Sequence, residues 1–134
     1  MLLLDTHVLL WLRLDSPRLG RQSRVLLDRA WEEGHAAIST ITFWEVGLLV
    51  SKGRLDVDID IDRWRTELLV AGLVDVPVSA EIAARAGLIP DMHGDPADRI
   101  IAATALTVDD CRLLTADERL LDWTGYLDRV DART

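Results

Sequence analysis

Short apolar runs alternate with longer segments of helical periodicity along this chain. The first run, Met1–Leu4, is wholly hydrophobic and ends at an acidic residue, which is typical of a buried strand in a parallel sheet. We expect further strands at 36–39, 74–78 and 113–114, and a last one at 126–130. Helices are expected at 6–12, 23–33, 42–49, 63–71, 79–87, 97–106 and 118–122. This alternation predicts an α/β fold, a three-layer α/β/α sandwich around a central parallel sheet.

The segment 57–62 does not fit the expected pattern of buried strands and amphipathic helices. Val57–Asp62 alternates strictly between apolar and acidic residues. A period of two predicts an exposed edge strand or an extended arm. Alternatively, Asp62 caps the helix expected at 63–71.

Composition bounds the class of protein. The chain has 134 residues, of which 49% are hydrophobic, so we expect a single domain over 1–134 with a sizeable core. Its net charge of −8 argues against a nucleic-acid binder, because phosphate contacts need basic residues. Two facts weaken that objection: bound metal would neutralise several acids, and every basic residue except Lys52 is an arginine, the side chain suited to bidentate phosphate contacts.

The single cysteine, Cys111, excludes an internal disulfide and lies in an apolar run typical of the core. The first residues do not resemble a signal peptide, and no apolar run is long enough to cross a membrane. We therefore expect a cytoplasmic protein without a membrane partner.

Four acidic residues fall where the pattern predicts a change from strand to helix. They are Asp5, Glu45, Asp98 and Asp117. Because the carboxyl ends of parallel strands share one edge of a sheet, we expect these side chains to meet in one pocket. Clustered carboxylates repel one another unless a cation joins them, so the pattern predicts a divalent metal site.

Each acid also has a structural explanation. An aspartate at a strand end is often the N-cap of the next helix, which applies to Asp5 and Asp117. Thr42 and Glu45 have the spacing of a capping box. Thr6 could bind a metal-bound water or help to cap. One shared site accounts for all four acids together, and this combination carries the inference.

The third acidic position contains two candidates. Asp95 and Asp98 flank Pro96, and either one would stabilise a helix N-terminus. Asp98 is the better ligand candidate because its register puts apolar residues on the packed side of the helix. Asp95 is then an outer acid or the cap, and Thr115, which directly follows the fourth expected strand and precedes Asp117 by two residues, belongs with it in a supporting group.

Aromatic and basic residues near these acids suggest a binding surface. Trp11 and Trp44 lie close to Asp5 and Glu45 in sequence and suggest an apolar groove where a partner docks. Four arginines form a basic patch that either guides a phosphate backbone or is a solvated helix face: Arg13, Arg18, Arg21 and Arg24. The histidines have no metal-ligand spacing. His93 lies near the acidic residues in sequence and could touch substrate, but we favour the interpretation as a loop histidine without a role.

At these residues the chain resembles a PIN domain, and specifically a VapC-type toxin of a bacterial toxin–antitoxin pair. The matching segments span most of the chain: Leu3–Trp11, Ile38–Ser39 with Trp44–Glu45, His93–Ala105 and Leu114–Asp117. Each segment alone is weakly diagnostic, whereas the four in this order are quite specific.

The resemblance implies an endoribonuclease that depends on Mg²⁺ or Mn²⁺, forms dimers, and is inhibited by a small DNA-binding antitoxin. It carries the family's catalytic acids onto Asp5, Glu45, Asp98 and Asp117, and leaves open which aspartate of the Asp-Pro-x-Asp-Arg motif binds metal. We expect Asp5, Asp98 and Asp117 to hold metal.

Three alternatives stay open. The chain could be a PIN-type nuclease directed at DNA, or a catalytically silent PIN domain that only binds a protein. A haloacid-dehalogenase-like phosphatase also begins with a strand and an aspartate, but it requires a second aspartate where this chain has His7.

Overall fold

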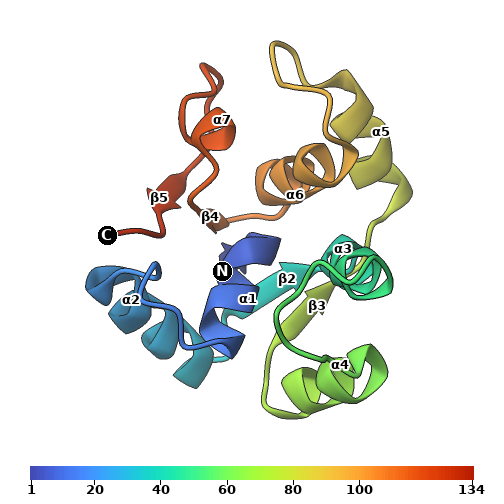
Figure 1. The fold of residues 1–134 in the computed structure, drawn as a ribbon. Helices are drawn as coiled ribbons and strands as arrows, with labels where there is room; N and C mark the ends of the chain where they lie inside the picture. Colours follow the sequence, from blue (N-terminus) through green and yellow to red (C-terminus); the bar gives the residue numbers. More distant parts are fainter.

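A computed structural model describes all residues from 1 to 134 (Figure 1). Five parallel strands form one sheet in the order β3-β2-β1-β4-β5. The strands are β1 (Leu2–Leu4), β2 (Ala36–Ser39), β3 (Val74–Val76), β4 (Arg112–Thr115) and β5 (Arg129–Asp131). The helices are α1 (Thr6–Arg13), α2 (Arg21–Glu32), α3 (Ile41–Ser51), α4 (Ile61–Val70), α5 (Ala80–Leu88), α6 (Pro96–Thr107) and α7 (Glu118–Leu121).

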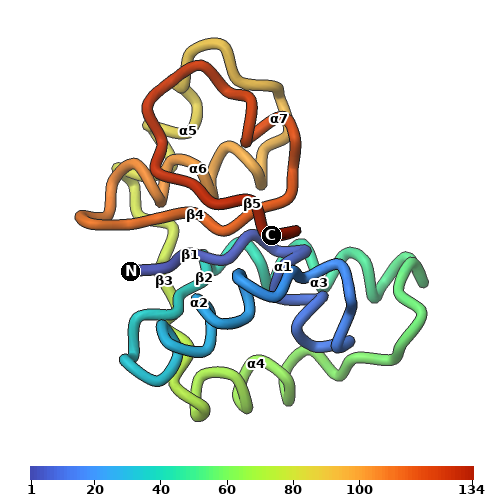
Figure 2. The backbone as a smooth tube through the Cα atoms, turned by 90° about the vertical axis from the view of Figure 1, so that its left-hand side faces the viewer, coloured from blue at the N-terminus to red at the C-terminus, as the bar shows by residue number.

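Helices cover both faces of the sheet, which confirms the three-layer α/β/α prediction (Figure 2). Because side chains alternate along a strand, Leu2 and Leu4 of β1 enter one core and Leu3 enters the other. The first core is closed by α1, α2, α3 and α4, and the second by α5, α6 and the segment around α7. The central strands are therefore buried on both faces, which explains why β1 is wholly apolar.

The strand order places a change of direction between β1 and β4. The chain builds outward from β1 to β2 and β3, then crosses back to add β4 and β5 on the other side. Open α/β sheets bind ligands outside the carboxyl ends of the strands at such a point. A ligand-binding site is therefore expected at the carboxyl edge of the sheet, beyond Leu4 of β1 and Thr115 of β4.

Two sequence predictions about the segment 57–62 are wrong. The segment forms no strand and does not join the sheet. Ile59 is instead buried in the first core. The helix that follows begins at Ile61, and its N-cap is Asp60, whose Oδ1 accepts a hydrogen bond from the Arg63 N–H at 3.2 Å. Asp62 lies inside the first turn instead of capping it.

Other boundaries differ by a few residues from those expected. The third strand ends at Val76, before Pro77, which has no N–H to donate to a sheet. The last strand spans Arg129–Asp131, later than the expected 126–130. None of the helices has both the length and the hydrophobicity that crossing a bilayer requires.

Candidate active site

Asp5 lies at the carboxyl end of β1 and is almost completely buried. It is the N-cap of α1, and its Oδ1 accepts a hydrogen bond from the Thr6 N–H at 2.8 Å. Its Oδ2 accepts a second bond from the Thr115 hydroxyl at 2.7 Å, across the point where β1 and β4 meet. The capping role and a place in the pocket are therefore combined in one residue.

Asp98 approaches the same edge from α6. This helix follows α5 directly, so Asp98 does not mark a change from strand to helix as the sequence suggested. Because α6 leads back into β4, its N-terminus nevertheless lies at the carboxyl edge of the sheet. Asp95 is the N-cap of α6 and is exposed, whereas Asp98 is buried, and its Oδ2 lies 2.9 Å from His93 Nε2.

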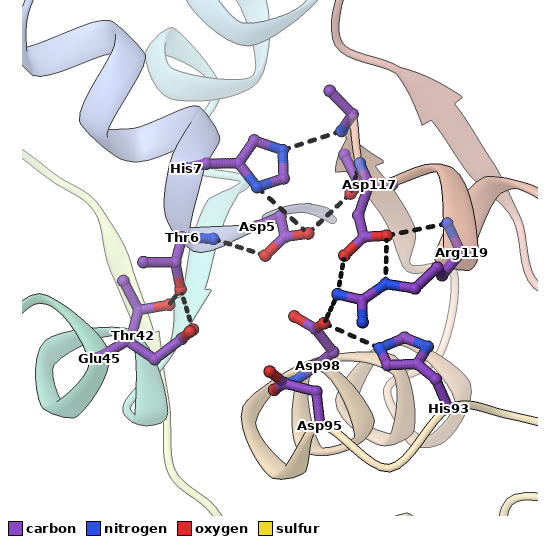
Figure 3. Close-up of polar contacts among 12 residues, drawn as sticks. Asp5, Thr6, His7, Thr42, Glu45, His93, Asp95, Asp98, Asp117 and Arg119 are labelled. Atoms are coloured by element: carbon purple, nitrogen blue, oxygen red, sulfur yellow. Dashed lines mark hydrogen bonds and ion pairs between the residues drawn. The ribbon is translucent and has the colours of Figure 1, made fainter.

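Asp117 follows β4 and is the N-cap of the short helix α7. Its Oδ1 accepts from the Arg119 N–H at 2.8 Å, and its own N–H donates to the Thr115 hydroxyl at 3.0 Å. The Arg119 guanidinium lies between two acids: Nη2 is 3.1 Å from Asp117 Oδ2 and 3.3 Å from Asp98 Oδ2 (Figure 3). One cation of the chain itself thus bridges two of the predicted metal ligands.

Glu45 reaches the pocket from one turn inside α3. The capping-box prediction is wrong, because α3 begins at Ile41 and Thr42 lies inside the helix, fully buried. Glu45 Oε1 instead accepts a hydrogen bond from the Thr6 hydroxyl, which also contacts the Thr42 hydroxyl at 3.1 Å. Thr6 therefore connects α1 with α3 beside the acids.

The pKa values indicate that these acids lie close together. The pKa of Glu45 is raised to about 7, mainly by burial and also by the charges of Asp5, Asp98 and Asp95, while the hydrogen bond from Thr6 opposes the rise. Burial likewise raises the pKa of Asp98 to about 6, with contributions from Asp5, Asp95 and Asp117 that oppose the hydrogen bond from His93. Burial alone would raise the pKa of Asp117, but hydrogen bonds from Arg119 hold it below its ordinary value.

The donor atoms are suited to a divalent cation. One ligand atom each from His93, Asp98 and Asp117 lies within 4.8 Å of the others. Asp5 and Glu45 lie beside this group and act on it electrostatically, but they do not belong to the compact cluster. Carboxylate oxygens favour Mg²⁺ or Mn²⁺, and a nearby imidazole suits Mn²⁺ better than Mg²⁺.

The residues proposed for a groove do not share one. Trp11 lines a cavity that also includes Asp117, whereas Trp44 lines another, between α3 and the start of α6, together with Glu45 and Asp95. Arg13 lies in a third, beside α4. The structure therefore separates these three side chains.

Sequence reasoning missed two participants. Arg119 was overlooked because a single arginine in a short helix has no pattern, although its position two residues after Asp117 is a usable signal. The sequence places His93 near the acidic residues but favours no role for it, whereas its contact with Asp98 makes it part of the group. Only the fold of the loop before α6 reveals that contact.

The sequence matches the PIN domain family over residues 2–124. The chain belongs to the PIN domain family. This PIN domain is 33% identical over 119 residues to Ribonuclease VapC22 of Mycobacterium tuberculosis (strain ATCC 25618 / H37Rv), a match that covers 88% of each chain.

Solved structures resemble this PIN domain over nearly its whole length. A toxin–antitoxin complex from Klebsiella pneumoniae matches with a TM-score of 0.62 and 26% identity, covering 98% of both chains. VapBC2 from Rickettsia felis, bound to a DNA fragment from its promoter, matches with a TM-score of 0.65 and 16% identity, covering 96% of both chains, which supports the fold alone. The resemblance to VapC-type PIN domains is thereby confirmed.

Proposed function

We propose that this PIN domain is an endoribonuclease that depends on Mg²⁺ or Mn²⁺ and acts as the toxin of a toxin–antitoxin pair. The observation that carries the proposal is the convergence of acids from four parts of the chain at the carboxyl edge of the sheet. Similarity to a protein named as a ribonuclease supports the reaction class. The expected single domain, 1–134, would contain the whole site.

Asp5, Asp98 and Asp117 would hold the cation, with His93 beside Asp98. A divalent cation supplies charge neutralisation at the phosphate and lowers the pKa of an attacking water. The donor set fits such an ion because burial, with a smaller contribution from the neighbouring acids, raises the pKa values of Glu45 and Asp98, and a bound cation would stabilise their charged forms.

Other side chains would hold or move protons. Glu45, with a pKa of about 7, is suited to accept a proton from water near neutral pH. The Thr6 hydroxyl keeps its carboxylate on the pocket side of α3. Thr115 donates to Asp5 and accepts from the Asp117 N–H, so it fixes the relative positions of two proposed ligands.

The partners of this chain are part of the same proposal. The Klebsiella pneumoniae structure is a toxin–antitoxin complex, and that likeness supports an antitoxin partner for this chain. We propose that this antitoxin is VapB-like and binds DNA. The acidic pocket would accept an antitoxin arginine, much as it already accepts Arg119. We propose a homodimer that joins the antitoxin in a hetero-oligomer, and activity on RNA in the cytoplasm.

Replacing Asp98 tests the nuclease. Asp98→Asn keeps the shape of the side chain and should abolish RNA cleavage, because it removes a charge from the proposed metal site. Asp62→Asn removes an equal charge from the exposed first turn of α4 and is the matched control. Cleavage of labelled RNA is measured with Mn²⁺ and with EDTA, and unchanged cleavage by a folded Asp98→Asn protein would contradict the proposal.

Two further experiments distinguish the proposed ribonuclease from the alternative functions. Single-stranded DNA of the same sequence is tested beside the RNA, and preferential cleavage of the DNA would identify a DNA-directed nuclease. Calorimetric titration with Mn²⁺ addresses a catalytically silent PIN domain, for which no binding is expected.

A further inference from the structure

An open cavity of about 630 Å³ adjoins the acidic group on the side of α1. It is lined by six residues from both ends of the chain: His7, Trp11, Arg18, Ala116, Asp117 and Arg133. This volume lies within the range of roughly 300–1,000 Å³ that is common for small-ligand sites. Because Asp117 belongs both to this cavity and to the proposed metal site, a ligand here would lie next to the reacting phosphate.

Two aromatic rings form one wall of the cavity. The rings of His7 and Trp11 are tilted by 58°, with centroids 5.1 Å apart. His7 is held in place, because its Nε2 accepts a hydrogen bond from the Ala116 N–H at 2.9 Å. Trp11 packs against the first core but is only half-buried, so part of its side chain stays accessible to solvent. Such a surface is suited to stacking a nucleobase.

The other wall is basic, in a chain with a net charge of −8. Arg18 lies in the turn between α1 and α2, which Arg24 fixes through its bonds to the Ser16 carbonyl at 2.7 Å and to Asp15 at 3.1 Å. Arg24 is therefore committed to the fold, whereas Arg18 is exposed and forms no ion pair in the structure. Of the four arginines in the predicted basic patch, only Arg18 faces this cavity.

Arg133 is brought to the same wall by the last residues of the chain. The Gly20 N–H donates to the Ala132 carbonyl at 2.8 Å, and a Cβ at Gly20 would collide with the backbone of Arg133 and Thr134. Ion pairs with Asp131 at 2.7 Å and Glu118 at 2.8 Å orient the guanidinium. The contact between the C-terminal segment and the start of α2 thus builds this side of the cavity.

We propose that this cavity binds one nucleotide of single-stranded RNA next to the phosphodiester that is cut, with the base against Trp11 and the backbone phosphate at Arg18. Arg133 supplies a second, weaker positive charge, because two acids already partner it. This inference rests on the proposed nuclease function. RNA fits better than a peptide because the cavity combines a stacking surface with a free guanidinium, directly beside acids that would act on a phosphate.

The phosphate contact is tested by salt dependence. Binding of a short fluorescein-labelled RNA to the Asp98→Asn protein is followed by anisotropy in Mg²⁺ at several salt concentrations. Arg18→Ala should weaken binding and lower the slope of log Kd against log salt by about 0.7, the value for one phosphate contact on a single strand. Arg21→Ala removes the same charge from an exposed position outside the cavity and should leave the slope unchanged.

The stacking contact is tested with abasic RNA. One base at a time is removed along the strand, and a single position should weaken binding by about fivefold or more. In Trp11→Ala that position should no longer matter, whereas in Trp44→Ala it should still matter. Circular dichroism and thermal melting establish that Trp11→Ala is folded. Arg18→Ala changes an exposed side chain and therefore tests the same cavity without disturbing the core.

The outcomes distinguish this site from the nuclease function itself. If the wild-type chain cuts RNA but Arg18→Ala leaves both Kd and slope unchanged, the cavity proposal is wrong and the function stands. If the wild-type chain does not cut RNA while binding still depends on Arg18 and Trp11, the cavity proposal stands and the function fails. If Arg18→Ala weakens binding of a Glu-rich peptide but not of RNA, the cavity is a protein-binding surface and the proposal is overturned.

Discussion

Arg119 brings a positive charge into the acidic group. Its guanidinium contacts Asp98 and Asp117 together, so a divalent cation that uses both carboxylates must displace it. The side chain is mostly exposed, which lets it swing into solvent when this happens. Arg119 therefore acts as a built-in competitor for the proposed metal site.

This competition predicts the effect of Arg119→Gln. The variant should bind Mn²⁺ more tightly than the wild type, by a few-fold, because the ion no longer displaces a paired cation and exposed ion pairs are weak. Isothermal titration calorimetry measures the change. Arg112→Gln, which breaks an exposed pair with Asp128 elsewhere on the sheet, is the control and should leave Mn²⁺ affinity unaltered.

A second prediction at this scale concerns pH. The pKa of Glu45 is raised from 4.5 to about 7 and that of Asp98 to about 6, so the folded state holds these protons more tightly than the unfolded state. Their contribution to stability is complete below the unfolded pKa and is lost as pH rises through the folded pKa. In EDTA, the melting temperature should therefore decline between about pH 5 and pH 8.

Thermal melting across this pH range tests the prediction, and in Glu45→Gln we expect the melting temperature to fall less steeply with pH than in the wild type. Glu67→Gln, an exposed change on α4, should leave it as in the wild type. A Glu45→Gln protein with the same pH dependence as the wild type would show that Glu45 is not the group responsible.

At the scale of elements, the acids were visible in the sequence because strand ends and helix starts are local signals. Asp5, Asp95 and Asp117 are all N-caps, so the capping explanation was right for each of them. The capping box at Glu45 failed because the helix begins earlier, at Ile41, and no local pattern reveals that Thr6 is its partner. The shared pocket was predicted, whereas the individual hydrogen bonds between elements distant in sequence remained hidden, such as those of Thr6 with Glu45 and of Thr115 with Asp5.

The loop before α6 depends on one side chain from that helix. Arg99 donates hydrogen bonds to five backbone carbonyls, those of Ala86, Gly87, Ile89, Met92 and His93. These bonds fix the end of α5 and the residue His93, which contacts Asp98. A loop without regular structure is thereby given one conformation.

Arg99→Lys should lower the melting temperature. Lysine keeps the charge but has three donors in a different geometry, so several carbonyls lose their partner, each at a cost of about 1–3 kcal/mol where the group is buried. Differential scanning calorimetry measures the loss. Arg85→Lys, on α5 with bonds to the Leu106 carbonyl and Thr107, is the milder comparison.

At the scale of the molecule, alternation of strands and helices was enough to predict a parallel α/β sandwich. The strand order was not predictable, because the pairing of β1 with β4 joins segments separated by most of the chain. The segment 57–62 was misassigned because alternation alone does not say whether a sheet edge is available to it. Ile59 is buried in the first core and Ile61 packs against it, whereas Val57 stays exposed.

Because the proposed ligands come from different parts of the fold, cation binding should stabilise the whole molecule. At a free Mn²⁺ concentration 100 times the Kd, mass action adds about 2.7 kcal/mol to the free energy of unfolding. Thermal melting with and without Mn²⁺ should reveal this shift in the wild type and a much smaller one in Asp98→Asn. An equal shift in both proteins would indicate that the ion binds elsewhere.

The hydrogen bond between Asp5 and Thr115, 110 positions apart, also bears on how the protein is made. During translation Asp5 leaves the ribosome 110 residues before Thr115. A nascent chain that has not yet reached residue 117 lacks one of the three proposed metal ligands, whatever its first hundred residues have folded into. The proposed cation site can therefore assemble only after β4 and the residues directly behind it have been synthesised.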